Sequence, residues 1–259
     1  MEELDLRSRY MELDDKTDAL NTYAGMRPEP RREFEERFDI SWVYHDNALE
    51  GVVLTSHEIK AAIDRKVISD VNLIPTYQEI KNHKAAIDFA REAAANKRTR
   101  VNLTLVKDLH TLFVREIEGT EAGRYRKEIP LHRTYFHEIA QPNRISYRLN
   151  KLLQAVGSAE FKRWHPINQA AAFHHEFMSI FPFPDNSGKV GRMLMNYFLM
   201  RAGYLPVVIH SIDRQRYYES LRGSVQGLRE LLIESMENGL DCGLRCLSEL
   251  IAKPTVCVQ

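Results

Sequence analysis

The feature that most constrains this chain is a proline-containing turn between two apolar patterns of helical spacing. It covers residues 180–192 and reads Ile-Phe-Pro-Phe-Pro-Asp-Asn-Ser-Gly-Lys-Val-Gly-Arg. Its two prolines force an extended passage, because proline cannot continue a helix. The Asp-Asn-Ser run that follows offers cap-type side chains where the second helix should begin. The sequence therefore predicts two central helices joined by a polar turn.

This turn carries the residue types of a phosphate and metal site. A loop entering a helix N-terminus presents free backbone N–H groups and the positive end of a dipole, so it can hold an anion. Lys189 and Arg192 lie three residues apart, on one face of the first helical turn. Asp185 is a hard oxygen ligand of the kind that Mg²⁺ uses when it also holds substrate phosphates. Turns of this composition also begin ordinary helices, so local chemistry alone leaves both interpretations open.

The turn resembles the core motif of the Fic family (Fic/Doc, or Fido, domains), which runs His-Pro-Phe-x-Asp/Glu-Gly-Asn-Gly-Arg-x-x-Arg. Five positions match: Pro182, Phe183, Asp185, Gly188 and Arg192. Four positions depart from it, with Phe181 in place of the histidine, Asn186 of the first glycine, Ser187 of the asparagine and Lys189 of the first arginine. The resemblance implies a mainly α fold, the helical bundle of Fic proteins with a short β-hairpin flap.

Fic proteins typically transfer AMP from ATP to a hydroxyl side chain of a target protein. The resemblance implies ATP and Mg²⁺ as ligands, with Asp185 on the metal. It places the phosphates on the turn and its cations, at Asn186, Ser187, Gly188, Lys189 and Arg192. In the family the histidine is the general base, a role worth about 10²–10⁴-fold in rate. Phe181 cannot accept a proton, so we expect no residue of this chain in the catalytic role.

Three functions remain open at this point. The chain is a degenerate Fic protein that binds a nucleotide or another phosphorylated ligand but is impaired in protein AMPylation. Alternatively, it is a pseudoenzyme that acts as a protein-interaction or regulatory module. The third alternative is an altered phosphoryl- or nucleotidyl-transfer chemistry on the same scaffold.

A second informative segment covers residues 41–66. Apolar positions at helical spacing from Ser41 onward end at Gly51, a residue typical of helix C-termini. Thr55 and Glu58 then have the spacing of a capping box, which predicts the start of another helix.

The end of the first of these helices resembles the inhibitory helix of many Fic proteins, with the pattern Ser/Thr-x-x-x-Glu-Gly/Asn. Glu50 and Gly51 match it, while Asp46 replaces the Ser/Thr. The resemblance implies that Glu50 pairs with Arg192 and blocks productive placement of ATP, which is autoinhibition. The alternative is a solvated glutamate at a helix end.

The remaining chain is expected to form one globular unit over residues 67–259. Residues 1–40 are expected to form a charged and irregular N-terminal arm, with an exposed linker at 27–32. Helical patterns within the core unit cover 70–99, a segment capped by Thr104, 143–153, 169–180, 213–221 and 229–251. We interpret His110 and His174 as packed residues and not as ligands or bases.

Residues 127–142 are β-prone around Pro130, which predicts a short hairpin. At this place Fic proteins have the flap, which registers a target protein's backbone by strand addition. The resemblance implies that a target protein docks on residues 127–142.

Composition sets the remaining expectations. The 259 residues suit one or two domains, and 36 Lys and Arg balance 36 Asp and Glu, so no basic field points to nucleic acid. No apolar run approaches the roughly 18 residues of a membrane span. The acidic N-terminus has no signal-peptide hydrophobic region, and the three cysteines do not suggest a disulfide framework. We therefore expect a cytoplasmic protein that binds neither nucleic acid nor membrane.

Overall fold

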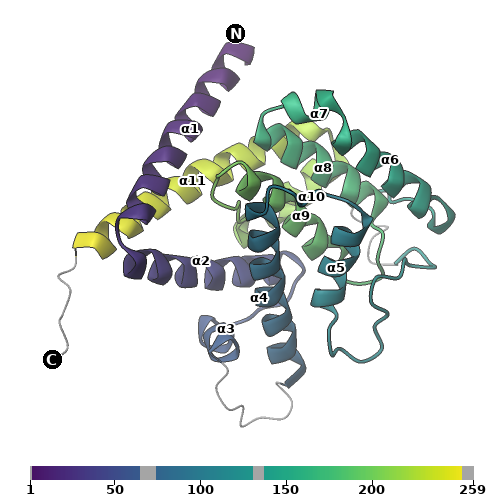
Figure 1. Cartoon of the computed structure of the whole chain (residues 1–259). Helices are drawn as coiled ribbons and strands as arrows, with labels where there is room; N and C mark the ends of the chain where they lie inside the picture. Colours follow the sequence, from purple (N-terminus) through teal and green to yellow (C-terminus); the bar gives the residue numbers. More distant parts are fainter. Residues whose placement is uncertain (1, 65–73, 131–136, 253–259) are drawn as a thin grey trace.

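The computed structural model describes residues 2–64, 74–130 and 137–252, and this part of the chain is mainly helical and contains no strand (Figure 1). The elements in chain order are α1 (Glu2–Met26), α2 (Pro28–Leu49), α3 (Ser56–Ile63), α4 (Ile74–Ala95), α5 (Leu103–Phe113), the 3₁₀ turn η3 (Pro142–Arg144), α6 (Ile145–Gly157), α7 (Ala159–Arg163), α8 (Pro166–Ile180), α9 (Ser187–Arg201), the 3₁₀ turn η4 (Ser211–Asp213), α10 (Arg214–Arg222) and α11 (Val225–Ala252).

Helix α9 is the centre of the bundle. It packs against α8, α4 and α5, and every residue from Ser187 to Leu199 is buried. A helix enclosed on all sides lies in a core and not at a surface. Its one central amide, Asn196, donates to the carbonyl of Val207 and accepts from the N–H of the same residue. The turn before α9 therefore leads directly into the centre of the bundle, although Pro184 and Asp185 within it are exposed.

The close approach of α8 and α9 depends on a glycine. A Cβ atom at Gly191 would lie 2.9 Å from Cδ1 of Phe177 and 3.1 Å from Nδ1 of His174, both on α8. Both of those side chains are fully buried. Gly191 therefore sets the distance between the two helices that carry the turn.

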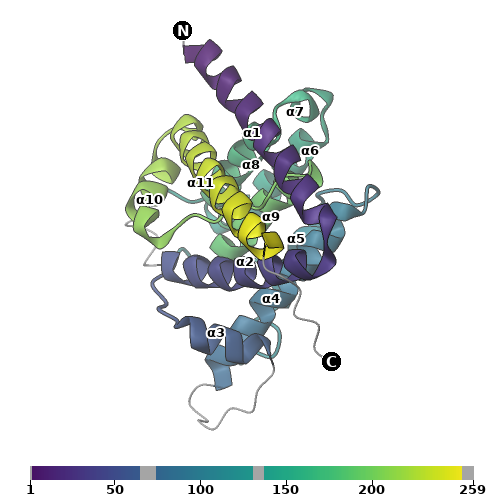
Figure 2. The same ribbon diagram turned by 90° about the vertical axis from the view of Figure 1, so that its left-hand side faces the viewer.

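The expectation of an irregular arm over residues 1–40 is wrong. Helix α1 covers this region as far as Met26, and α2 begins at Pro28, inside the expected linker. Proline is tolerated there because the first helical positions need no N–H donor. Figures 1 and 2 show α1 lying along α11 near the C-terminal end of the chain.

Tertiary packing explains why the pattern of α1 was misread. Only a few of its residues, among them Leu13 and Leu20, are buried. Gly243 of α11 lets Leu20 approach closely, since a Cβ there would lie 3.1 Å from Leu20 Cδ1. Arg9 also pairs with Glu237 of α11 at 2.8 Å. Most helical stability comes from such packing and not from local propensity.

Several helix ends agree with the sequence and one does not. The capping box of Thr55 and Glu58 at α3 is confirmed, and the expected helices over α4, α6, α8, α10 and α11 are present. The cap of α5 is Asn102, not Thr104, because the Asn102 side chain accepts the N–H of Leu105. The expected hairpin over residues 127–142 is not supported: its described parts, 127–130 and 137–142, contain no strand, and residues 131–136 lie outside the described residues.

Replacing Gly191 by alanine should lower the free energy of unfolding by about 1–3 kcal/mol, because the added methyl overpacks the α8–α9 contact. Urea denaturation followed by circular dichroism measures this. Gly239→Ala is the matched control, since its Cβ would meet only Leu205 Cδ2 at 3.7 Å. Equal effects of the two substitutions would contradict the close-approach argument.

Candidate functional site

The turn between α8 and α9 begins with a residue in a left-handed conformation. Phe181 ends α8 with φ 47° and ψ 67°, and its N–H donates to Phe177 O at 2.8 Å. Non-glycine residues adopt this region uncommonly. The phenyl side chain is only 2% exposed. At the position where the motif has a histidine, this chain therefore presents packed hydrocarbon.

A buried arginine clamps the start of the turn. Arg126, which is 4% exposed, donates from Nε to Phe181 O at 2.7 Å and from Nη2 to Ile180 O at 3.2 Å. The same guanidinium also donates to the carbonyls of Glu128 and Ala140, on the two flanks of the expected flap. Cations near a helix C-terminus are stabilised by its dipole. Arg126 thus ties the flap flanks to the end of α8.

The middle of the turn is closed by Ser187. Its hydroxyl accepts the N–H of Phe183 at 2.8 Å and donates to the carbonyl of the same residue at 3.0 Å. The hydroxyl expected to contact a phosphate is therefore engaged within the turn, and the residue is fully buried. Asn186 occupies the N-cap of α9 with φ 56° and makes no side-chain cap bond, so the expected side-chain capping is absent.

The first turn of α9 brings the two expected cations and Glu50 together. Arg192 donates from Nη2 to Glu50 Oε1 at 2.9 Å. A Cβ at Gly188 would lie 2.5 Å from the same carboxylate oxygen, so Glu50 rests against the backbone at the start of α9. Lys189 is 6% exposed and forms no ion pair with the residues that the structure describes. The Glu50 carboxylate thus lies where the sequence predicts a bound anion.

A second carboxylate holds the same arginine. Asp46, four residues before Glu50 on α2, accepts from Arg192 Nε and lies with Oδ2 3.1 Å from Nε2 of His83 on α4. Arg192 Nη2 also donates to the backbone carbonyl of Asp46 at 3.3 Å, and Nη1 lies 3.5 Å from the Tyr217 hydroxyl. All three guanidinium nitrogens therefore face acceptors of the chain.

The end of α2 is held so that Glu50 faces α9. Gly51 follows with φ 90°, a conformation that favours glycine and ends the helix directly after Glu50. The last helical carbonyl, that of Leu49, accepts hydrogen bonds from Arg214 Nε at 2.8 Å and from the Tyr218 hydroxyl at 3.1 Å. Both donors belong to α10, so three helices fix the position of Glu50.

Electrostatics favour the ionised form of these groups. Burial alone would raise the pKa of Asp46, but the charge of Arg192 and the contact with His83 outweigh it and lower the pKa to about 2. Burial alone would also raise the pKa of Glu50, but the charges of Arg192 and Lys189 outweigh it and lower the pKa. Burial would lower the pKa of Arg192, whereas Asp46, Tyr217 and Glu50 raise it well above its ordinary value. The cluster is an ion-pair network at neutral pH.

Two histidines near the turn are packed, as expected. His110 stacks on Phe183 with ring centroids 3.9 Å apart, and its Nδ1 accepts the N–H of Gly123 at 2.9 Å. His174 lies under α9 with Nε2 2.9 Å from the Tyr217 hydroxyl. Burial lowers the pKa of His110 to about 4 and, together with the charge of Arg192, that of His174 to about 3. Both rings are neutral at pH 7.

The arrangement suits one metal ion held together with a phosphate. Asp185 is exposed at the rim of the turn, and the described residues contain no group of three or more metal-ligating side chains. Mg²⁺ is commonly held by one or two carboxylates and by substrate phosphates, so a single carboxylate fits that mode only when the phosphates are present.

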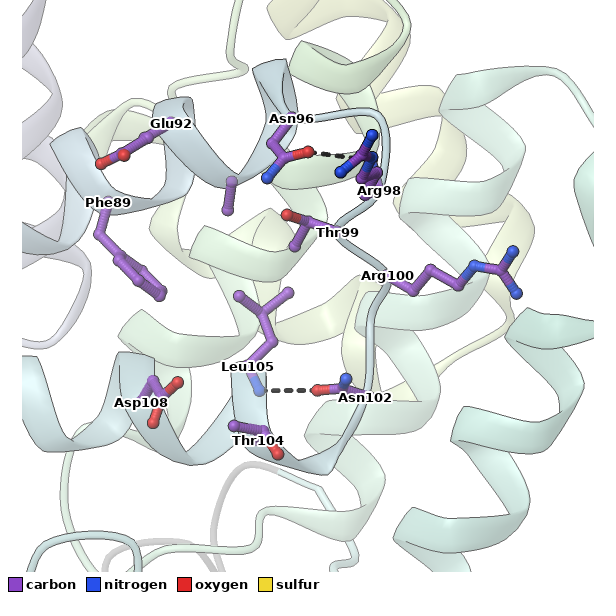
Figure 3. A pocket seen from close by; sticks show the side chains of 11 residues that line it. Phe89, Glu92, Asn96, Arg98, Thr99, Arg100, Asn102, Thr104, Leu105 and Asp108 are labelled. Atoms are coloured by element: carbon purple, nitrogen blue, oxygen red, sulfur yellow. Dashed lines mark hydrogen bonds between the residues drawn. The ribbon is translucent and has the colours of Figure 1, made fainter.

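The cavity drawn in Figure 3 lies elsewhere. It has a volume of about 440 Å³ and is formed by the end of α4, the α4–α5 loop and the start of α5, with Glu92, Arg98, Arg100 and Asp108 among its walls. None of the residues expected at the phosphate site lines it. The candidate site is therefore defined by its buried charges and not by this cavity.

Known proteins match the chain at both the sequence and the fold level. Residues 100–199 match the Fic/DOC family. Over these residues, from the α4–α5 loop into α9, the chain is similar to a Fic/DOC family domain. Proteins named protein adenylyltransferase Fic from Aedes aegypti and Drosophila virilis are 28% and 26% identical to it over 256 and 257 residues, or 96% and 97% of this chain. The chain spans about half the length of these relatives, 50% and 52%.

Solved Fic structures share the fold. Fic-1 residues 134–508 from C. elegans superimpose with a TM-score of 0.82 at 20% identity, covering 94% of this chain and 73% of that one. A Fic domain-containing signaling protein from Bacteroides thetaiotaomicron gives a TM-score of 0.75 at 22% identity, covering 94% and 95%. The Fic-like fold therefore extends well beyond the residues that match the family. In the described part of the chain, no helix has the length and apolar character to cross a bilayer.

Sequence reasoning missed four residues of this site: His83, Tyr217, Arg126 and Arg214. His83 and Tyr217 lie within helical patterns, and nothing local distinguishes Arg126 from its exposed neighbour Arg124. Their roles depend on contacts between distant segments, which residue spacing does not reveal.

Acid should destabilise the fold through His174. Its pKa is about 3 in the folded chain and 6.5 ordinarily, so below pH 6.5 the unfolded chain binds a proton that the folded chain does not. The contribution of the neutral His174 ring to the free energy of unfolding is thus fully present above pH 6.5. It is lost as the pH falls toward 3, by about 1.4 kcal/mol per pH unit. His174→Gln should flatten this slope in urea denaturation between pH 7 and pH 5. An unchanged slope would show that His174 is protonated in the folded protein.

Proposed function

We propose that this Fic protein binds ATP or a related phosphorylated ligand at the start of α9, that Glu50 restrains this binding, and that AMP transfer to a protein hydroxyl is impaired. The observation that carries the proposal is the position of the Glu50 carboxylate. It lies against Gly188 and pairs with Arg192 at 2.9 Å, at the place where helix dipole, backbone N–H groups and cations favour an anion.

The charges of the site support phosphate binding. Lys189 forms no ion pair with the described residues, and Arg192 can exchange Glu50 for a phosphate oxygen. When bound with the phosphates, Mg²⁺ would neutralise part of their charge, and Asp185 is the carboxylate placed to hold it. Lys189 supplies charge without the bidentate fork of an arginine, so it attracts a phosphate but orients it less strictly.

Impaired transfer follows from Phe181. A hydroxyl nucleophile must lose its proton as it attacks phosphorus, and a positioned base is worth about 10²–10⁴-fold. Phe181 has no acceptor atom in its side chain. The packed histidines do not replace it, because His110 Nδ1 accepts from Gly123 and His174 Nε2 contacts Tyr217 beneath α9.

The relatives named protein adenylyltransferase Fic support the reaction class, AMP transfer from ATP. Docking of a target protein on residues 127–142 is part of the same proposal. It is supported by Arg126, which holds both flanks of this segment against the end of α8, next to Phe181.

Removing the inhibitory carboxylate should expose the anion site. Glu50→Gly is expected to bind ATP with Mg²⁺ at least ten-fold more tightly than the unmodified chain, measured by isothermal titration calorimetry, because Arg192 and Lys189 then face the ligand. The Glu50→Gly, Arg192→Met double variant is the control and should lose the gain. An absence of heat with both the unmodified chain and Glu50→Gly would remove the binding proposal.

Restoring the base tests the catalytic half. Phe181→His in the Glu50→Gly background should transfer label from ATP to protein about 10²-fold or more faster than Glu50→Gly alone, measured with labelled ATP. Asp185→Ala in the same background should abolish the label. Robust labelling by the chain with Phe181 intact would contradict the proposed impairment.

A further inference from the structure

Arg192 is shared between two carboxylates of one helix end, and they differ in how firmly they are held. Glu50 is the last residue before the turn at Gly51, and its side chain is about one-fifth exposed. Asp46 lies one helical turn earlier, inside α2, with a side chain only 4% exposed. Glu50 can leave the site by a change at the helix end, whereas Asp46 can leave only if α2 itself detaches.

The contacts of Asp46 reinforce this difference. One carboxylate oxygen accepts from Arg192 Nε, and the other lies 3.1 Å from His83 Nε2. Asn47, the next residue, donates to the carbonyl of Val43 at 2.7 Å and lies 3.4 Å from His83 Nδ1, which fixes the ring from its other side. His83 is fully buried, and burial lowers its pKa, so it contributes a neutral contact and not a second positive charge.

The charge balance then differs from that of a site in which position 46 is uncharged. With Glu50 in place, two cations face two carboxylates: Lys189 and Arg192 against Asp46 and Glu50. When Glu50 leaves, one net positive charge remains, where a serine or threonine at position 46 would leave two. After Glu50 has left, Asp46 therefore still cancels one of the two positive charges of Lys189 and Arg192.

We infer that Asp46 is a permanent counter-charge to Arg192, a positioning residue that makes the anion site at the start of α9 discriminate against highly charged phosphate ligands. The inference rests on the proposed function, since it concerns ligands of the same site. Asp46 holds the guanidinium through Nε and through its backbone carbonyl, while Nη2 also contacts Glu50 and Nη1 lies close to Gly188. It weakens the attraction of the guanidinium for each additional phosphate charge.

Coulomb energy scales with the charge of the ligand, so the effect of Asp46 on affinity should increase with the number of phosphate charges. Removing the Asp46 charge should leave adenosine binding unchanged and should tighten the binding of AMP, ADP and ATP by increasing factors. A purely structural role of Asp46 would alter all four ligands alike. Asp46→Asn is the suitable change, because asparagine keeps an oxygen acceptor for Arg192 Nε at nearly the same size.

The experiment compares Glu50→Gly with the Glu50→Gly, Asp46→Asn double variant by calorimetry in EDTA, with adenosine, AMP, ADP, ATP and inorganic tripolyphosphate. We expect a gain on the order of ten-fold for ATP and tripolyphosphate, smaller gains for ADP and AMP, and none for adenosine. The gain should shrink as salt is raised, because screening weakens charge interactions.

Asp39→Asn in the Glu50→Gly background is the matched control. Asp39 is also a buried aspartate of α2 that pairs with an arginine, with Oδ2 2.8 Å from Arg91 Nη1. Within the described residues, Arg91 forms ion pairs with Asp39 and Asp88 and not with Asp46 or Glu50. Substitution of Asp39 should lower thermal stability but should not produce a gain in affinity that increases with the charge of the ligand. If the double variant with Asp46→Asn does not fold, Asp46→Asn alone, with Glu50 retained, is expected to bind tripolyphosphate more tightly than the unmodified chain.

The outcomes separate the two proposals. If Glu50→Gly binds neither ATP nor tripolyphosphate, the proposed function is wrong. In that case, a gain in affinity for tripolyphosphate on adding Asp46→Asn would still support the counter-charge role of Asp46. The absence of such a gain would overturn that role. If Glu50→Gly binds ATP but Asp46→Asn adds nothing, or changes adenosine as much as ATP, the inference fails and the proposed function stands.

Discussion

The structure depends on a buried guanidinium that joins three helices. Arg192 of α9 is held by Asp46 and Glu50 at the end of α2 and lies beside the Tyr217 hydroxyl of α10. A charge taken out of water is costly unless its partners are close and well placed, and removing one partner of such a pair is strongly destabilising. The ion pair therefore requires α2 to lie across the start of α9. The same requirement places the Glu50 carboxylate against Gly188, at the start of α9.

The turn before α9 is organised by a second buried arginine. Arg126 collects the carbonyls at the end of α8 and those of the flap flanks, so the chain leaves α8 at Phe181 in a defined direction. Ser187 then closes the loop on Phe183, and the backbone enters α9 with Gly188 against the Glu50 carboxylate. The backbone of the turn is thus closed by its own side chains, although the side chain at position 181 has no acid–base chemistry. The cations of α9 and the side chain at position 181 belong to different ends of the same turn, so ligand binding and proton transfer can be tested by separate substitutions.

Sequence reasoning succeeded where the signal was local. The prolines and the Asp-Asn-Ser run marked the turn, Gly51 marked the end of α2, and the Thr55–Glu58 spacing marked the start of α3. The Glu50–Arg192 contact was anticipated from the family resemblance and lies within hydrogen-bond distance. The errors fell on segments whose helical state depends on distant partners. Helix α1 exposes most of its surface and is held by Leu13, Leu20 and Arg9 against α11, which no window of its own sequence reveals.

The family resemblance implied the mainly helical class. By itself, the sequence determined the place of the central turn, the absence of a proton acceptor in the side chain of Phe181 and the presence of a glutamate directly before the glycine that ends a helix. These follow from backbone preferences and side-chain chemistry, which a residue carries wherever it lies. Only the tertiary structure decided that Asp46 shares Arg192 with Glu50, that Ser187 is consumed within the turn and that Arg126 anchors the flap flanks. Those roles depend on which atoms meet across helices far apart in the chain, because burial turns an ordinary charge or hydroxyl into a group that must be paired.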